Sequence, residues 1–207
     1  MKLIVGLGNP GEKYINTRHN LGFVIIEHFL KDFQSAKNTI WENSLKFKSE
    51  ISQIEWQPRH GNLEKVILVK PQTYMNNSGL AVSLISQSAS WRILVSDIWI
   101  LHDDIDLPLG AMKIRFGGAS AGHHGVESII EYLNTDKFWR FRMGTGVESG
   151  KLRVENLKLR NMDDFVLGSF TGSEKGKVKD LIKRGVKAIE TSLEDGLEKA
   201  MNRFNTK

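Results

Sequence analysis

The chain has 207 residues, 40% of them hydrophobic and 26% charged, which suits one domain with a buried core. It has no cysteine, which excludes disulfides, thiolate metal sites and a cysteine nucleophile. Its net charge of +5 is compatible with a polyanionic partner, while the absence of a long apolar run or a signal-peptide pattern predicts a cytoplasmic protein.

The first half of the chain predicts strands interrupted by one helix. Residues 2–5 are apolar and precede a glycine-rich turn, which is typical of a buried strand. Beyond Leu21 an amphipathic helix is expected, with an apolar stripe of Ile26, Phe29, Leu30 and Phe33. Strands at 46–56 and 65–70 flank turn residues at 58–62 and predict a β-hairpin.

The second half continues the alternation of strands and helices. The expected elements are a helix capped by Asn76 and Asn77 and ending near residue 88, strands at 98–101, 111–116 and 141–147, a helix from Gly125, and a helical tail at 173–204 broken near Gly196. This alternation predicts a single α/β domain over residues 1–207, with a twisted mixed sheet flanked by helices and with C-terminal helices.

Three glycines after the first strand spell the pattern of a dinucleotide-binding loop. Gly6, Gly8 and Gly11 have the required G-x-G-x-x-G spacing. However, Pro10 and polar residues follow where a helix should open, and Glu27 lies inside the predicted helix rather than after a second strand. The pattern therefore favours a tight turn over a cofactor site, and a dinucleotide-binding enzyme stays as a less favoured alternative.

Polar residues gather where strands end or helices begin, and two of them suggest hydrolytic chemistry. A neutral His19 could accept a proton from water, and Asp103 could fix its tautomer. Each residue also has an ordinary explanation, as a helix cap for His19 and as a solvated loop acid for Asp103. Spacing alone does not decide between these possibilities.

The same polar residues do not have the spacing of a metal site. Asp103, Asp104 and Asp106 lack the order of a calcium-binding loop. His123 and His124 are adjacent in sequence and point in different directions. No metal or cofactor is therefore expected.

Several motifs together resemble those of a known family. The segments VGLGNPGEKYINTRHNLGF, KPQTYMNNSG, HDDIDLPLG, GHHG and FRMGTG are similar, in this order, to the motifs of bacterial-type peptidyl-tRNA hydrolases. They run from Val5 to Gly146, and FVLGSF from Phe165 and DGLEKAMNRFN from Asp195 fit the same pattern. The resemblance implies hydrolysis of the ester between peptide and tRNA in peptidyl-tRNA, by a monomer without an obligate protein partner.

The resemblance also implies roles for particular residues. It makes His19 the general base, Asp103 the group that keeps it basic, and Asn9 the residue that distinguishes blocked peptidyl-tRNA from free aminoacyl-tRNA. The residues it places at the substrate or the tRNA are Tyr14, Asn20, Tyr74, Met75, Asn76 and His124, with Arg115 and Arg142 at the 5′-phosphate of the tRNA. Amide side chains both donate and accept, which suits recognition of a peptide backbone of any sequence.

The chain departs from the family pattern in the loop GGASAG and, more importantly, in the motif that follows it. The family motif is GHNG, whereas this chain has Gly122, His123, His124 and Gly125, so that His124 replaces a substrate-binding amide. We expect activity to survive with an altered pH dependence or affinity. The change also leaves open a second alternative, a non-catalytic RNA-binding relative on the same fold, although such a protein would be expected to lack His19 or Asp103.

A row of lysines in the C-terminal region is spaced for one face of a helix. Lys175, Lys179, Lys183 and Lys187 lie at successive i, i+4 positions, with Arg184 alongside. The row is either a phosphate-tracking face for tRNA or an ordinary solvated face.

Overall fold

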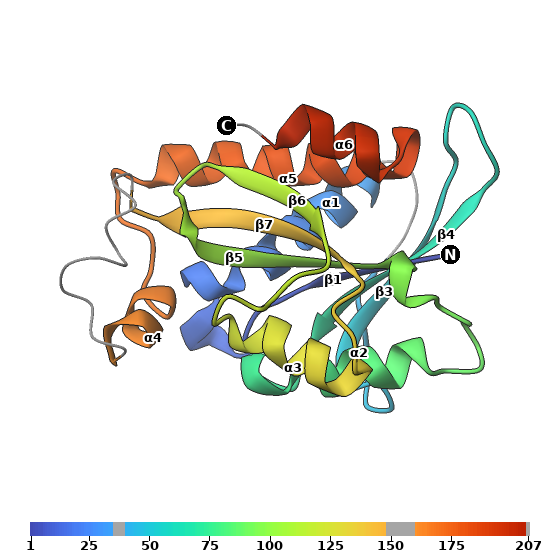
Figure 1. The fold of residues 1–207 in the computed structure, drawn as a ribbon, viewed down its shortest axis with the longest axis horizontal. Helices are drawn as coiled ribbons and strands as arrows, with labels where there is room; N and C mark the ends of the chain where they lie inside the picture. The colour runs from blue at the N-terminus through green and yellow to red at the C-terminus, as the bar shows by residue number, and fades with distance from the viewer. Residues whose placement is uncertain (35–39, 148–159, 206–207) are drawn as a thin grey trace.

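A computed structural model describes residues 1–34, 40–147 and 160–205. These residues form a seven-stranded mixed sheet in the order β2-β3-β4-β1-β5-β7-β6, with helices on both faces (Figure 1). The α/β architecture expected from the sequence is confirmed. No helix within the described ranges is long and apolar enough to cross a membrane.

The centre of the sheet is parallel. Its strands are β1 (Lys2–Gly6), β4 (Glu64–Pro71), β5 (Ile98–Pro108) and β7 (Trp139–Gly146). β1 pairs in parallel with β4 on one side and β5 on the other, and β5 pairs in parallel with β7. These strands are covered on both faces, which explains why they read as short apolar runs rather than as alternating patterns.

The edges of the sheet are antiparallel. β2 (Glu42–Ser44), β3 (Ser49–Trp56) and β4 form one edge, and β6 (Met112–Phe116) pairs with β7 at the other. The predicted β3–β4 hairpin is confirmed. The short polar strand β2 was not predicted, because three residues carry too little pattern to reveal it.

Two helical layers enclose the sheet, as Figure 1 shows. The helices are α1 (Leu21–Gln34), α2 (Ser78–Ser86), α3 (His124–Leu133), α4 (Arg160–Val166), α5 (Lys175–Asp195) and α6 (Leu197–Phe204). α1, α5 and α6 pack on the face that contains Ile4, and α2 and α3 on the face that contains Leu3 and Val5. Successive side chains of a strand point to opposite faces, so that one run supplies both cores. The C-terminal helices break at Gly196, as predicted.

Short 3₁₀ helices connect the main elements. They are η1 (Glu12–Tyr14), η2 (Arg18–Asn20), η3 (Met75–Asn77) and η4 (Val95–Asp97). η2 leads directly into α1, and η3 leads directly into α2. Both therefore place polar residues at the start of a helix.

Two glycines of the G-x-G-x-x-G pattern, Gly6 and Gly8, allow close packing, whereas Gly11 has no atom near its Cβ position. A Cβ atom on Gly6 would lie 2.4 Å from the carbonyl oxygen of Gly22, and one on Gly22 would lie 2.4 Å from the carbonyl oxygen of Leu101. α1 can therefore approach β1 and β5 only because these positions lack side chains. This contact supports the interpretation of the motif as a turn that brings helix and sheet together.

Two element boundaries differ from the prediction. β5 continues to Pro108 instead of ending near Leu101, because its pairing with β7 continues beyond the apolar run. α2 begins at Ser78, and the side chain of Asn77 does not cap it but accepts a hydrogen bond from the Tyr132 hydroxyl. Because β5 is longer than predicted, Asp103 and Asp104 lie within a strand rather than in a loop.

Candidate active site

His19 lies in η2, which is anchored through the neighbouring residue Arg18. Arg18 is buried, and its Nη2 lies 2.8 Å from both carboxylate oxygens of Glu174, while its Nη1 donates to the carbonyl oxygen of Ser169 at 2.7 Å. The Arg18 guanidinium also stacks near the rings of Phe165 and Phe170. These contacts join η2 to the segment between α4 and α5 and so hold the backbone of His19 in place.

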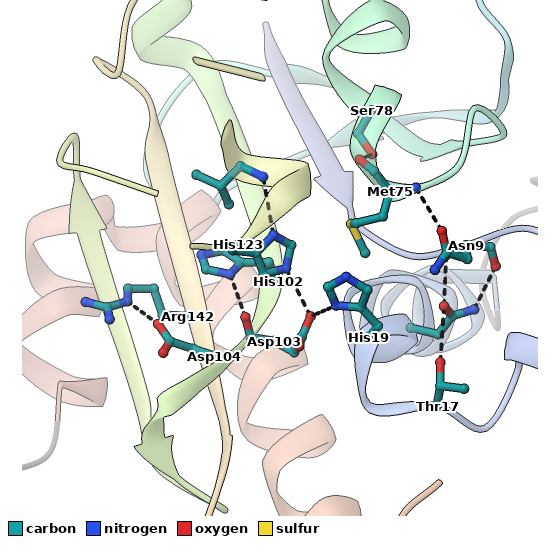
Figure 2. A network of polar contacts seen from close by, with 12 residues as sticks. Asn9, Thr17, His19, Met75, Ser78, His102, Asp103, Asp104, His123 and Arg142 are labelled. Carbon is teal, nitrogen blue, oxygen red and sulfur yellow. Dashed lines mark hydrogen bonds and ion pairs between the residues drawn. The ribbon is translucent and has the colours of Figure 1, made fainter. Parts of the chain in front are cut away.

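The side chains of His19 and Asp103 form a buried pair (Figure 2). His19 Nδ1 lies 2.8 Å from Asp103 Oδ1, and Asp103 is only 1% exposed. Because a carboxylate accepts the Nδ1 proton, the Nε2 lone pair of a neutral His19 is left available as a base. Burial lowers the pKa of His19, but the charge and hydrogen bond of Asp103 raise it more, so that its pKa lies above the usual 6.5.

Asp103 stays ionised in spite of its burial. Burial alone raises the pKa of a carboxyl group, but His19 and His123 both interact with this one and hold its pKa well below the usual range. Asp103 therefore supplies a permanent negative charge beside His19.

Asn9 lies on the side of His19 opposite Asp103 (Figure 2). Hydrogen bonds of both its backbone and its side chain hold it in place. The Asn9 N–H donates to Asn20 Oδ1 at 2.8 Å, and Asn20 Nδ2 donates back to the Asn9 carbonyl at 3.0 Å. Asn9 Oδ1 accepts from the Met75 N–H at 2.8 Å, which turns the Asn9 nitrogen toward the side where His19 lies (Figure 2). Asn9 thus presents donors to the site, while the buried Asn20 has its amide committed to Asn9.

Several other predicted substrate residues lie in or next to η3, which contacts Asn9 through the Met75 N–H. Met75 is buried, and Asn76, the next residue of η3, is exposed. The Tyr14 and Tyr74 rings meet edge to face with centroids 6.4 Å apart, and Tyr74 is 54% exposed with a backbone φ of 59°. An aromatic pair and an amide therefore border the Asn9 side of the site.

The two predicted phosphate-binding arginines differ in their environments. Arg115 is exposed on β6. Arg142 is largely buried and its Nε donates to Asp104 Oδ2 at 2.5 Å. A third arginine, Arg140 on β7, donates to the carbonyl oxygens of Gly117 and Ala119. Burial and the nearby charges of Arg142 and Arg115 lower the pKa of Arg140.

A cavity of 330 Å³ is lined by His19 but not by Asn9. Its lining residues are His19, His102, Asp103, Asp104, Ile105, Ser120, Ala121, Gly122, His123, His124, Met162, Asp163 and Val166. The side chain of His124 is 58% exposed at the start of α3, 3.8 Å from Asp163 on α4 and 3.6 Å from Glu127. His124 therefore faces α4 across the mouth of this cavity.

His123 belongs to the cluster, although no role was predicted for it. Its Nε2 lies 3.0 Å from Asp103 Oδ1, the same oxygen that contacts His19. A Gly-His pair directly before a predicted helix is a usable signal for such a residue, because it occupies the N-cap.

His19, Asp103 and His123 also form, among the described residues, a cluster that a metal ion could bridge, with ligand atoms within 4.8 Å of one another. Both imidazole nitrogens that face Asp103 are engaged in hydrogen bonds with it. The expectation of a metal-free site stays a prediction.

Comparison with known proteins places this geometry in a family. The family model described as peptidyl-tRNA hydrolase matches residues 3–207. The chain belongs to the peptidyl-tRNA hydrolase family. A relative from Syntrophotalea carbinolica named peptidyl-tRNA hydrolase is 38% identical over 100% of this chain and 98% of its own length. One of the same name from Bacillus subtilis is 36% identical over the full length of both.

Solved structures agree with the sequence relatives. Peptidyl-tRNA hydrolase from Acinetobacter baumannii is 29% identical and superposes with a TM-score of 0.82 over 100% of this chain and 95% of its own. The prediction of the family and of an enzyme of the hydrolase class is confirmed, and none of these comparisons favours the non-catalytic alternative.

Proposed function

We propose that this member of the peptidyl-tRNA hydrolase family cleaves the peptide–tRNA ester with His19 as general base and Asp103 as its partner. The observation that carries this proposal is the buried 2.8 Å contact between His19 Nδ1 and Asp103 Oδ1. It leaves His19 Nε2 to take a proton from water as the water attacks the ester carbonyl. The ester C–O bond then breaks, the peptide leaves as a carboxylic acid, and His19 returns the proton to the ribose oxygen of the tRNA.

Amides and aromatic rings on the Asn9 side would bind the peptide and the terminal nucleotide. We assign the Asn9 nitrogen to a substrate carbonyl, because its oxygen is already occupied by the Met75 N–H. The exposed Asn76 and the Tyr14–Tyr74 pair border the same side, and the buried Met75 supports them from below. The contacts of Asn20 support an indirect role, in which it positions Asn9.

The arginines on β6 and β7 are assigned to the 5′-phosphate of the tRNA. Arg115 is exposed and suited to direct contact, while Asp104 orients Arg142. A substrate made during translation would place the protein in the cytoplasm. A monomer without an obligate partner is expected, and light scattering of the purified protein checks it.

The proposal is tested by ester cleavage of an N-blocked aminoacyl-tRNA. We expect turnover by the unaltered protein, with kcat/KM rising with pH through a value above 6.5, because only neutral His19 is a base and its pKa is raised. His19→Ala and Asp103→Asn should each lose roughly 10²-fold or more in kcat.

Asp106→Asn is the matched control, because Asp106 lies on the same strand and is exposed. Its rate should stay within about twofold of the unaltered protein, as is usual for exposed substitutions. Absence of turnover by the unaltered protein would refute the enzymatic proposal and favour an RNA-binding protein without catalysis.

A further inference from the structure

His123 connects the start of α3 to the His19–Asp103 pair. As the N-cap of α3, its Nδ1 accepts a hydrogen bond from the Val126 N–H at 3.3 Å. Its Nε2 lies 3.0 Å from Asp103 Oδ1 (Figure 2). The side chain is only 9% exposed, so that water does not easily replace either partner.

These two contacts determine which nitrogen of a neutral His123 carries the proton. A backbone N–H only donates, and the nitrogen facing it must therefore present a lone pair. Nδ1 is thus unprotonated and Nε2 carries the hydrogen, which points at Asp103. The backbone of α3 therefore fixes the tautomer of a side chain in the active site.

The carboxylate oxygen Asp103 Oδ1 accordingly accepts two hydrogen bonds, one from His19 Nδ1 and one from His123 Nε2. A second donor spreads the negative charge of the acceptor and fixes the rotation of the carboxyl group. Both effects act on His19, because Asp103 orients its ring and raises its pKa.

We propose that His123 is a positioning residue for catalysis, which uses the backbone of α3 to fix the orientation of Asp103 and to limit the basicity of His19. This inference rests on the proposed function of His19 and Asp103. Without His123, the less satisfied carboxylate would stabilise the protonated form of His19 more strongly. A larger share of His19 would then be protonated, and unable to act as a base, near neutral pH.

The surroundings of the cluster are compatible with this role. The titratable groups that interact with His19 are Asp103 on β5, His123 at the start of α3, and Asp163 on α4. His102, also on β5, packs edge-on against His123 at a centroid distance of 4.7 Å. Burial and His123 lower the pKa of His102 well below its usual value, so that it stays neutral.

The same tautomer argues against a metal ion in this cluster. A metal bound to His123 Nε2 would move the proton to Nδ1, where it would face the donating Val126 N–H. Two donors would then oppose each other at the start of α3. The hydrogen-bonded arrangement satisfies both nitrogens, and metal ligation does not.

The experiment separates the contact with Asp103 from the capping of α3. His123→Asn keeps a side-chain oxygen that caps helices well, but it is too short to reach Asp103. His123→Ala loses both functions. The pKa of His19 is measured by NMR of labelled imidazoles, and the pH profile of kcat and KM is measured on N-blocked aminoacyl-tRNA.

In both variants we expect the pKa of His19 and the acid limb of kcat/KM to move upward together, by about one pH unit. We expect kcat at neutral pH to fall about tenfold with little change in KM, because substrate contacts are unaltered. If His123→Asn behaves like the unaltered protein in both measurements, His123 is only a helix cap and the proposal is overturned.

A measurement on the unaltered protein completes the test and does not depend on activity. Two-bond ¹H–¹⁵N correlations report which imidazole nitrogen carries the proton, and we expect Nε2 in His123. An Nδ1-protonated His123 would overturn the proposal even if the protein hydrolyses its substrate. Conversely, a raised His19 pKa in the variants of a protein without turnover would refute the proposed function and leave the hydrogen-bond assignment standing.

Discussion

At the scale of single residues, His124 stands where the family resemblance predicts an asparagine. It lines the cavity at the start of α3 and faces Asp163 on α4. Both side chains are more than half exposed. A histidine supplies one donor when neutral and gains a positive charge on protonation, whereas an asparagine donates and accepts at every pH. The identity of this residue should therefore affect the pH dependence of substrate binding.

We expect His124→Asn to stay active and to change KM about two- to fivefold, because asparagine supplies both a donor and an acceptor at this position. The effect should be small, because exposed ion pairs at such distances contribute only about 0–1 kcal/mol. Measurement of KM for N-blocked aminoacyl-tRNA at a series of pH values, from about 5.5 to 8.5, checks this.

Asp163→Asn serves as the control, because it removes the charge that faces His124 and leaves α3 unaltered. It should remove part of the same pH dependence. Equal KM values for His124→Asn and the unaltered protein at every pH would contradict a role for this position in binding.

At the scale of elements, the crossing of α2 and α3 aligns the two halves of the site. α2 follows η3 with Met75 and Asn76, and α3 begins beside His123 and His124. The helices touch at Gly79, whose N–H donates to Ser128 Oγ at 3.0 Å. A Cβ atom on Gly79 would lie 2.1 Å from the carbonyl oxygen of Ser128.

We therefore expect Gly79→Ala to lower the free energy of unfolding by about 1–3 kcal/mol, because the overlap involves backbone atoms that cannot rotate away. Chemical denaturation measures this change, and KM should rise as η3 moves. Gly176→Ala is the matched control, since it also lies in a helix but has no atom near its Cβ. That variant should be slightly stabilised, by up to about 1 kcal/mol.

Most elements could be predicted because their patterns are local. The apolar stripe of α1 and the break at Gly196 are visible in a short window of sequence, and the structure confirms both. The continuation of β5 to Pro108 could not be predicted, because polar residues such as Asp103 and Asp104 suggest a loop. They lie in a strand because β7 offers backbone partners and because His19, His123 and Arg142 pair with their charges.

At the scale of the whole molecule, two sets of basic side chains are candidates for contact with the tRNA. One is the exposed Arg115 on β6. The other is the row of lysines on α5, where Lys175, Lys179 and Lys183 line a groove of 660 Å³ between α1 and α5. Lys187 lies further along the helix and pairs with Glu190 at 2.8 Å, and Arg184 donates to the carbonyl oxygen of Gly110.

We expect replacement of all four lysines by glutamine to weaken tRNA binding and to reduce the slope of log Kd against log salt concentration by about 2–3. Each phosphate contact contributes about one unit to this slope, and Lys187 is already paired. Filter binding of deacylated tRNA across a salt series measures the slope.

Arg115→Gln is the comparison and should reduce the slope by about 1. An unaltered slope in the fourfold lysine variant, together with a reduced slope for Arg115→Gln, would show that the row on α5 is an ordinary solvated face.

The sequence by itself determined the class of fold, the family motifs and the candidate residues His19 and Asp103. Periodicity reports which residues are buried, and motifs report chemistry that depends on residue type and order. The tertiary structure decided which of these residues meet, because a contact across 84 positions of sequence depends on how η2 and β5 pack. Only the tertiary structure revealed His123 as a second partner of Asp103. The tautomer of His123 is fixed by the backbone N–H of Val126, and a pattern of side chains carries no information on such a contact.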